Sequence, residues 1–244
     1  MVKFYESTYS YDYSFPAVTL AYFLRYPNPY STHVLSTDVI SRDIDAAGRL
    51  HTLRVHRKSS RLPSAILKLL PKSVLGSSAK TGKSESFILE SSTIDVKEGW
   101  MRTESRNLDW TGILSVVERQ EYQRRIPVDE GDDFSVGTGT TGVTTTVMFR
   151  SRFGDRMRAR ARDAVSSDSD DEPKKGFLAS LGTSALQRSI EAIASGRTET
   201  QMGKAKEGMV VVLDRMRQGG LGAVLEGMRR DREQYMMGSE SVQG

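Results

Sequence analysis

Residues 26–40 read YPNPYSTHVLSTDVI and mark the point where a helix gives way to a strand. Pro27 and Pro29 lack an amide donor and disfavour the helical conformation in the residue before them, so no helix continues through this stretch. The residues that follow alternate and are rich in β-branched side chains, which predicts a strand. The junction therefore places Arg25 at the end of a helix and His33 at the start of a strand.

The segments on either side of this junction predict an α+β fold. Residues 2–13 alternate as a strand does, and Ser14 followed by Pro16 is typical of a helix start. After the junction, strands are expected at about 33–42, 49–58, within 86–124, and at 144–150. Consecutive strands without helices between them favour an antiparallel sheet, with the helices gathered at one side.

The second half of the chain contains a long predicted helix and a change of composition before it. Six arginines at positions 150–162 are followed by SSDSDDEPKK, so we expect a disordered insertion at about 151–176; the alternative is a basic arm for anionic lipid or a phosphorylated acidic patch. A helix is predicted from Thr183 to about Gln218, where GGLG interrupts it. Residues 1–217 then form one domain, and residues 218–244 a polar helical or disordered tail.

Composition excludes several classes of function. The 35 basic and 31 acidic residues are mixed along the chain and leave a net charge of +4, too little for a nucleic-acid-binding face. The chain has no cysteine, which excludes disulfides, zinc-thiolate sites and thiol nucleophiles. No stretch approaches the roughly 18 consecutive apolar residues of a membrane span, so a soluble protein is expected. The first residues carry no secretory signal or ordinary presequence, and sequence signals alone point to the cytosol.

No catalytic or cofactor-binding motif is present. His33, His51 and His56 show no metal-ligand spacing, and neither a nucleophile elbow nor a phosphate-binding glycine loop is found. We therefore expect no enzyme, metal or cofactor, although a hydrolase with Asp and His scattered on the sheet stays open.

Two patterns concern binding. In the strand at 49–58, a period of two puts Arg54, His56 and Lys58 on one face, which is either solvated or part of a pocket. On the long helix, the stripe of Leu186, Ile190 and Ile193 continues into cationic and polar residues, namely Arg197, Gln201 and Lys204. Either that part of the helix meets water, or its cations face a cavity with an apolar interior. With Arg25, such a cavity would suit an anionic lipid.

A short apolar segment, LPSAILKLLP, occupies residues 62–71. It is either a buried helical turn or a lid that touches a membrane.

Three segments closely resemble the PRELI-like family of mitochondrial intermembrane-space phospholipid-transfer proteins. They are FLRYPNPYSTHVLSTDVISRDID at 23–45, GRLHTLRVHRKSSRLPSAI at 48–66 and RNLDWTGILSVVE at 106–118. The likeness covers about residues 1–124, 144–150 and 183–217. Within the family, the chain is most similar to the yeast-type Ups proteins that carry phosphatidic acid. The insertion near 151–176 is a departure from these relatives.

The resemblance implies a twisted antiparallel sheet of about seven strands, with a long C-terminal helix and a lid loop enclosing a lipid tunnel. It implies that Arg25 binds the lipid phosphate, with help from basic or polar residues of the neighbouring strands and the long helix. These are His33, Arg54, Lys58, Arg61, Arg197, Gln201 and Lys204. The apolar segment at 62–71 corresponds to the lid of the family. The expected lid and membrane contacts are therefore Leu62, Pro63, Ile66, Leu67, Leu69 and Leu70.

The function implied is non-enzymatic transfer of phosphatidic acid from the outer to the inner mitochondrial membrane for cardiolipin synthesis. The resemblance also implies a small twin-cysteine helical-hairpin partner, transient contact with anionic membranes and a location in the intermembrane space, which replaces the cytosolic expectation. The alternatives are a phosphatidylserine carrier of the same family, a non-lipid basic adaptor protein and a hydrolase.

Overall fold

A computed structural model describes residues 2–61, 83–109, 111, 114–125, 139–151 and 174–240, and side chains within 4–59, 85–109, 111, 114–125, 139–150 and 200–237. Its elements are β1 (Val2–Tyr11), α1 (Phe15–Phe23), β2 (Val34–Ile44), β3 (Leu50–Arg61), β4 (Lys83–Asp95), β5 (Trp100–Asn107), β6 (Leu114–Arg124), β7 (Thr141–Ser151) and α6 (Lys174–Glu240). No helix in these ranges has the length and apolarity needed to cross a bilayer.

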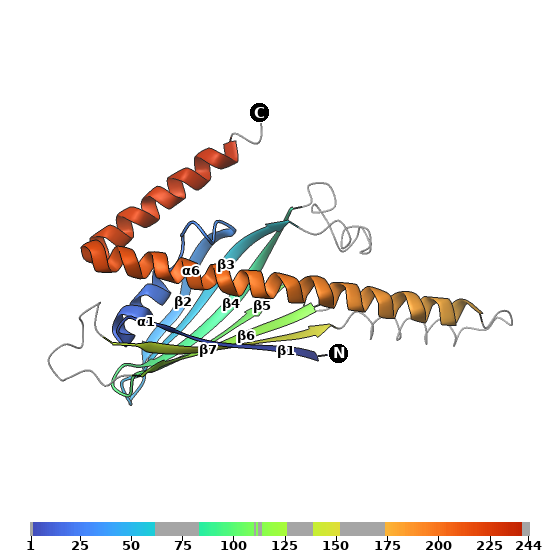
Figure 1. Cartoon of the computed structure of the whole chain (residues 1–244), viewed down its shortest axis with the longest axis horizontal. Helices are drawn as coiled ribbons and strands as arrows, with labels where there is room; N and C mark the ends of the chain where they lie inside the picture. The colour runs from blue at the N-terminus through green and yellow to red at the C-terminus, as the bar shows by residue number, and fades with distance from the viewer. Residues whose placement is uncertain are drawn as a thin grey trace.

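The strands form one antiparallel sheet in the order β1-β7-β6-β5-β4-β3-β2. Each strand from β2 to β6 pairs with the strand that follows it in sequence, and β1 pairs with β7. Because β1 and β2 are the two edges, α1 and the proline junction carry the chain from one edge to the other. Helix α6 runs across one face of the sheet (Figure 1). The predicted α+β fold with seven antiparallel strands and a long C-terminal helix is confirmed.

The hydrophobic core lies between the sheet and the two helices. Tyr22 of α1 packs edge to face on Tyr122 of β6, with ring centroids 5.7 Å apart. Helix α6 covers this pair with a buried stripe at helical spacing. The stripe consists of Met209, Val212, Leu213 and Met216. Burying these apolar side chains is the main force that holds α6 against the sheet.

The proline junction after α1 is fixed by Asn28, which is only 2% exposed. Its side-chain amide donates to the carbonyl oxygen of Arg25, and its Oδ1 accepts the backbone N–H of Tyr30 at 2.9 Å. Gly208 of α6 passes directly over the Asn28 side chain. The junction is therefore a packed, hydrogen-bonded corner that holds Arg25 against the sheet.

The structure of α6 differs from the sequence prediction at both ends. The helix begins at Lys174 rather than Thr183, so the last residues of the predicted insertion are helical; residues 152–173 lie outside the described part. The expected interruption is a kink at Gly219 and Gly220, the latter at φ 61°, after which the helix resumes. The resumed segment is not wholly polar, because Val224 is fully buried in the core. The domain boundary at residue 218 stays a prediction.

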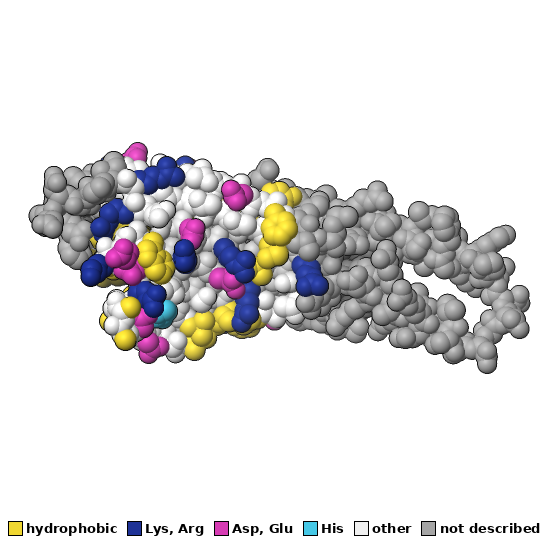
Figure 2. All heavy atoms as spheres, turned by 90° about the horizontal axis from the view of Figure 1, so that it is seen from below, with side chains coloured by type: hydrophobic (Ala, Val, Ile, Leu, Met, Phe, Trp, Pro, Cys, Tyr) yellow, Lys and Arg dark blue, Asp and Glu magenta, His cyan; other side chains and the backbone are white. Residues whose placement is uncertain are grey.

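The outer face of the sheet, away from α6, is largely polar, with charged side chains of both signs scattered over it (Figure 2). Leu53 and Val55 lie on this outer face, whereas Thr52, Arg54 and His56 are buried on the inner one. The basic face predicted for residues 49–58 therefore points toward the helices. Its charges need partners inside the protein.

Candidate functional site

A cavity of about 110 Å³ lies between the inner face of the sheet, the proline junction and α6. Its wall includes residues from β1, β3, β4, β6 and α6, so it exists only once the chain is folded. Five residues predicted from the sequence line it together: Arg25, His33, Lys58, Gln201 and Lys204. These residues are spread from position 25 to position 204 in the sequence. The order of the strands in the sheet and the path of α6 across it bring them together.

Arg25 points inward and is already paired. Its side chain is 14% exposed, and Nη2 donates to Oε2 of Glu90. The guanidinium stacks over the Tyr22 ring at 3.7 Å and lies 4.8 Å from the Tyr26 ring, two cation–π contacts that fix its orientation. The end of α1 therefore presents Arg25 to the cavity as a rigid, partly neutralised cation.

Glu90 is the centre of this buried cluster and is 1% exposed. It also accepts the Nε of Arg54 at 2.9 Å, and Nε2 of His56 lies 3.2 Å from its Oε2. Burial alone would raise the pKa of the Glu90 carboxyl, but Arg25, His56 and Arg54 together hold that pKa well below its usual value. Glu90 is therefore an ionised counter-ion at neutral pH.

Arg54 lies behind the cavity rather than in its wall. It is 3% exposed, bonds to Glu90 and donates to the carbonyl oxygen of Phe23 at 3.3 Å. The structure thus brings Arg54 next to Arg25 through their shared carboxylate, but not to the cavity surface, where it was expected to meet a ligand.

The unbalanced charge of the cavity comes from Lys58 and Lys204. Neither ammonium makes an ion pair or a hydrogen bond within the described part of the chain. His33 lies beside both of them: burial, then Lys58 and Lys204, lower its pKa to about 4. The imidazole is neutral at pH 7, so the two lysines create a positive potential next to a ring that offers hydrogen bonds. This arrangement suits an anion.

Glu118 of β6 is the second carboxyl group in the cavity wall. Its Oε1 accepts the side-chain amide of Gln120 at 2.8 Å. Burial raises the pKa of Glu118, although Lys58 and Arg25 act in the opposite direction. The two carboxyl groups of the cavity therefore differ, because their surroundings lower the pKa of Glu90 and raise that of Glu118.

Sequence reasoning missed both glutamates. Glu90 had a weak signal, because it is the charged residue on a strand face shared with Ile88 and Ile94. Glu118 had none, since its strand alternates polar residues on both faces.

The apolar interior expected for the lipid chains stays a prediction, because the side chains of residues 60–84 and 174–199 are not described. Tyr11, Glu90 and Tyr122 are among the most buried members of the cavity wall, and all of them carry polar groups. Polar side chains thus line the described part of the cavity, together with the apolar side chains of Ile88, Met202, Ala205 and Met209.

Some predicted site residues have side chains that the structure does not describe. Arg61 belongs to β3 and Arg197 to α6, but their side chains are not described. All the lid residues lie outside the described part of the chain. These are Leu62, Pro63, Ile66, Leu67, Leu69 and Leu70.

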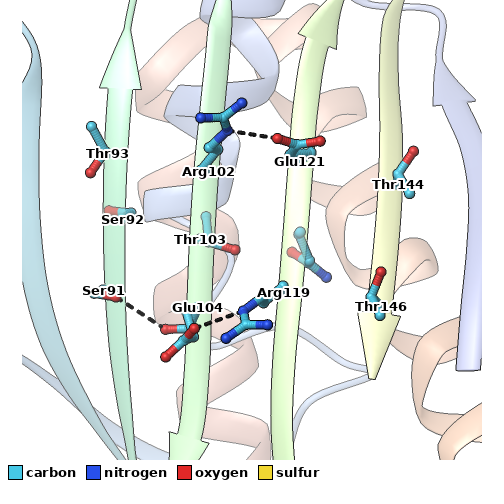
Figure 3. A pocket seen from close by; sticks show the side chains of 11 residues that line it. Ser91, Ser92, Thr93, Arg102, Thr103, Glu104, Arg119, Glu121, Thr144 and Thr146 are labelled. Atoms are coloured by element: carbon cyan, nitrogen blue, oxygen red, sulfur yellow. Dashed lines mark hydrogen bonds and ion pairs between the residues drawn. The ribbon is translucent and has the colours of Figure 1, made fainter. Parts of the chain in front are cut away.

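A larger depression, about 390 Å³, lies on the outer face of the sheet and is a weaker candidate. Arg102 pairs with Glu121 at 2.6 Å and Arg119 with Glu104 at 2.8 Å across neighbouring strands, among serines and threonines (Figure 3). Because each arginine has its own carboxylate, the depression has no unbalanced charge with which to select a ligand.

The chain is similar in sequence to proteins of one known family. The model of the PRELI-like family matches residues 16–130. "Protein UPS1, mitochondrial" of Saccharomyces cerevisiae is 35% identical over 178 residues, which is 73% of this chain and 90% of that protein. "Protein ups1 homolog" of Schizosaccharomyces pombe is 40% identical over 117 residues, covering 48% and 60% of the two chains.

A mammalian relative extends the comparison beyond fungi. "PRELI domain-containing protein 1, mitochondrial" of Bos taurus is 32% identical over 123 residues, covering 50% of this chain and 52% of that protein. The resemblance found in the sequence is thereby confirmed, and the chain belongs to the PRELI-like family.

Proposed function

We propose that this chain is an intramitochondrial phospholipid transfer protein that carries phosphatidic acid from the outer to the inner membrane for cardiolipin synthesis. Family membership supports transfer, and one observation supports the anionic head group. The ammonium groups of Lys58 and Lys204, which have no ion-pair or hydrogen-bond partner among the described residues, converge on one cavity from β3 and α6, beside Arg25. The phosphate lies between these cations, while Arg54 and Glu90 hold Arg25 in place.

The charge of the cavity favours phosphatidic acid over the runner-up, phosphatidylserine. A phosphate monoester carries about −1.5 to −2 charges at pH 7, enough to balance Lys58 and Lys204. A phosphodiester carries one charge, which balances only one of them. A non-lipid adaptor would instead present its cations on the surface, whereas Arg25 faces inward and is 14% exposed.

The acyl chains need an apolar enclosure of their own. Exposing roughly 30 methylenes to water costs about 0.8 kcal/mol each, a total that no head-group contact offsets. The segment at 62–71 is the proposed cover. The lipid leaves the protein chemically unchanged, so the function is transport and not catalysis.

The partner protein and the cellular location are also inferred from family membership. The protein acts in the mitochondrial intermembrane space, touches anionic membranes transiently and is stabilised by a small twin-cysteine helical-hairpin protein. The relatives named mitochondrial in yeast and cattle support the compartment. Co-purification of such a hairpin protein with the full chain tests the partner directly.

The test of the carrier is transfer between liposomes. Replacing both Lys58→Gln and Lys204→Gln removes two charge-assisted contacts worth about 1.5–3 kcal/mol each, so transfer of fluorescent phosphatidic acid should fall at least about tenfold. Lys97→Gln, in the exposed turn between β4 and β5, is the matched control and should transfer as wild type. Wild-type transfer by the folded double variant would refute the head-group site. A change in the mass of the recovered lipid would reveal an enzyme.

A further inference from the structure

We propose that Glu118 is the proton-binding residue of the head-group site, so that loading of a phosphate anion is coupled to uptake of one proton by its carboxyl group. The inference rests on the proposed function, because it concerns the same cavity. It adds a residue and a form of regulation that the family resemblance did not supply.

The position of Glu118 suits this role. Its strand, β6, places it opposite Ser105 of β5 and Val147 of β7, with its side chain in the cavity wall. Gln120 donates to Oε1, and no described group donates to Oε2. One carboxyl oxygen is therefore held in place while the other is available to carry a proton.

The charged groups around Glu118 come from every element that surrounds the cavity and oppose one another. Arg25 after α1 and Lys58 on β3 favour its ionised form, whereas Glu90 on β4 favours the neutral one. Lys204 on α6 lines the same cavity. None of these cations lies within ion-pair distance of Glu118. The other titratable groups in the wall are His33, His56, Tyr9, Tyr11, Tyr26 and Tyr122.

Burial moves the pKa of Glu118 upward. A phosphate that enters takes over the attraction of Lys58 and Arg25 and adds a negative charge, and both changes favour the neutral acid. The proton comes from solvent, forms an O–H bond on the carboxyl group, and can then be donated to a phosphate oxygen. On release, the proton returns to solvent. Lower pH therefore favours loading and higher pH favours release.

Proton uptake can be counted directly. Titration calorimetry of the full chain with dihexanoyl phosphatidic acid, in buffers of different ionisation enthalpy at one pH, gives the number of protons bound per ligand. We expect Glu118→Gln to bind fewer protons than wild type, by up to one. Its affinity should also gain less as the pH falls, by up to about tenfold per pH unit. Glu121→Gln, on the outer face of the same strand, should behave as wild type.

The same experiments separate the possible failures. Protons taken up by His33, His56 or the phosphate itself occur in both proteins and cancel in the difference, so equal uptake by wild type and Glu118→Gln overturns the inference. If Glu118→Gln does not fold, the ¹³C resonance of the Glu118 carboxyl in wild type decides: its titration midpoint must rise when ligand is added, and an unchanged midpoint refutes the coupling. No binding of the lipid by wild type at any pH would refute the proposed function as well.

Discussion

At the scale of single residues, Glu90 decides whether the cavity can exist. It is the buried counter-ion of Arg25 and Arg54, and removing one member of such a cluster leaves charge without compensation in a low-dielectric interior. We expect Glu90→Gln to lower the free energy of unfolding by about 3–5 kcal/mol in urea denaturation. Glu104→Gln breaks an ion pair on the exposed face and should cost less than about 1 kcal/mol. Equal costs would contradict the buried role.

The pH dependence has a definite sign. Because folding lowers the pKa of Glu90, its contribution to stability is complete above the unfolded value of about 4.3 and is lost as the pH falls through the folded value. Wild type should therefore lose stability more steeply below about pH 4 than Glu90→Gln does.

Residue patterns predicted which side chains share a face, but not their partners. Alternation correctly grouped Arg54, His56 and Lys58, and helical spacing correctly aligned Gln201 with Lys204. Arg54 meets Glu90 because the two lie directly opposite in the β3–β4 register, 36 positions apart in the chain. Nothing in either strand alone specifies that register.

At the scale of elements, the approach of α6 to the proline junction depends on a glycine. A Cβ on Gly208 would lie 2.8 Å from Nδ2 and 2.9 Å from Oδ1 of Asn28, whose bonds to Arg25 and Tyr30 prevent it from moving away. Gly208→Ala should therefore lower the free energy of unfolding by about 1–3 kcal/mol, in spite of the better helix propensity of alanine. Gly203→Ala, which meets nothing within 4 Å, should instead be neutral or raise it by up to about 1 kcal/mol. Thermal or chemical denaturation checks both.

Element boundaries were predictable where local signals are strong. Ser14, Pro16 and Pro27 bracketed α1, and Gly48, at φ 81°, ended the turn between β2 and β3 as expected. Helix α6 starts nine residues before the predicted position and runs through Gly176 and Gly182. Glycine lowers helix propensity by about 1 kcal/mol, which the surrounding helical residues override.

At the scale of the whole molecule, the C-terminal segment after the kink packs against the core and against the preceding part of α6. Val224 is fully buried in the core, Met228 packs beside it, and Asp231 bonds to Arg215 on the preceding part of α6 at 2.7 Å. These contacts fold the end of the helix back onto the stripe that covers the sheet. A segment expected to be a polar tail therefore shields the core next to the cavity.

Two truncations test this role. Deleting residues 221–244 exposes the surface under Val224 and Met228 and leaves Arg215 without Asp231, so the free energy of unfolding should fall by roughly 3–5 kcal/mol, measured in urea. Deleting residues 238–244 removes no side chain that the structure describes and should leave stability within about 0.5 kcal/mol of wild type. If both truncated proteins unfolded at the wild-type urea concentration, Val224 would contribute nothing to the core. The domain would then end at the kink, because α6 up to Gln218 would hold the sheet by itself.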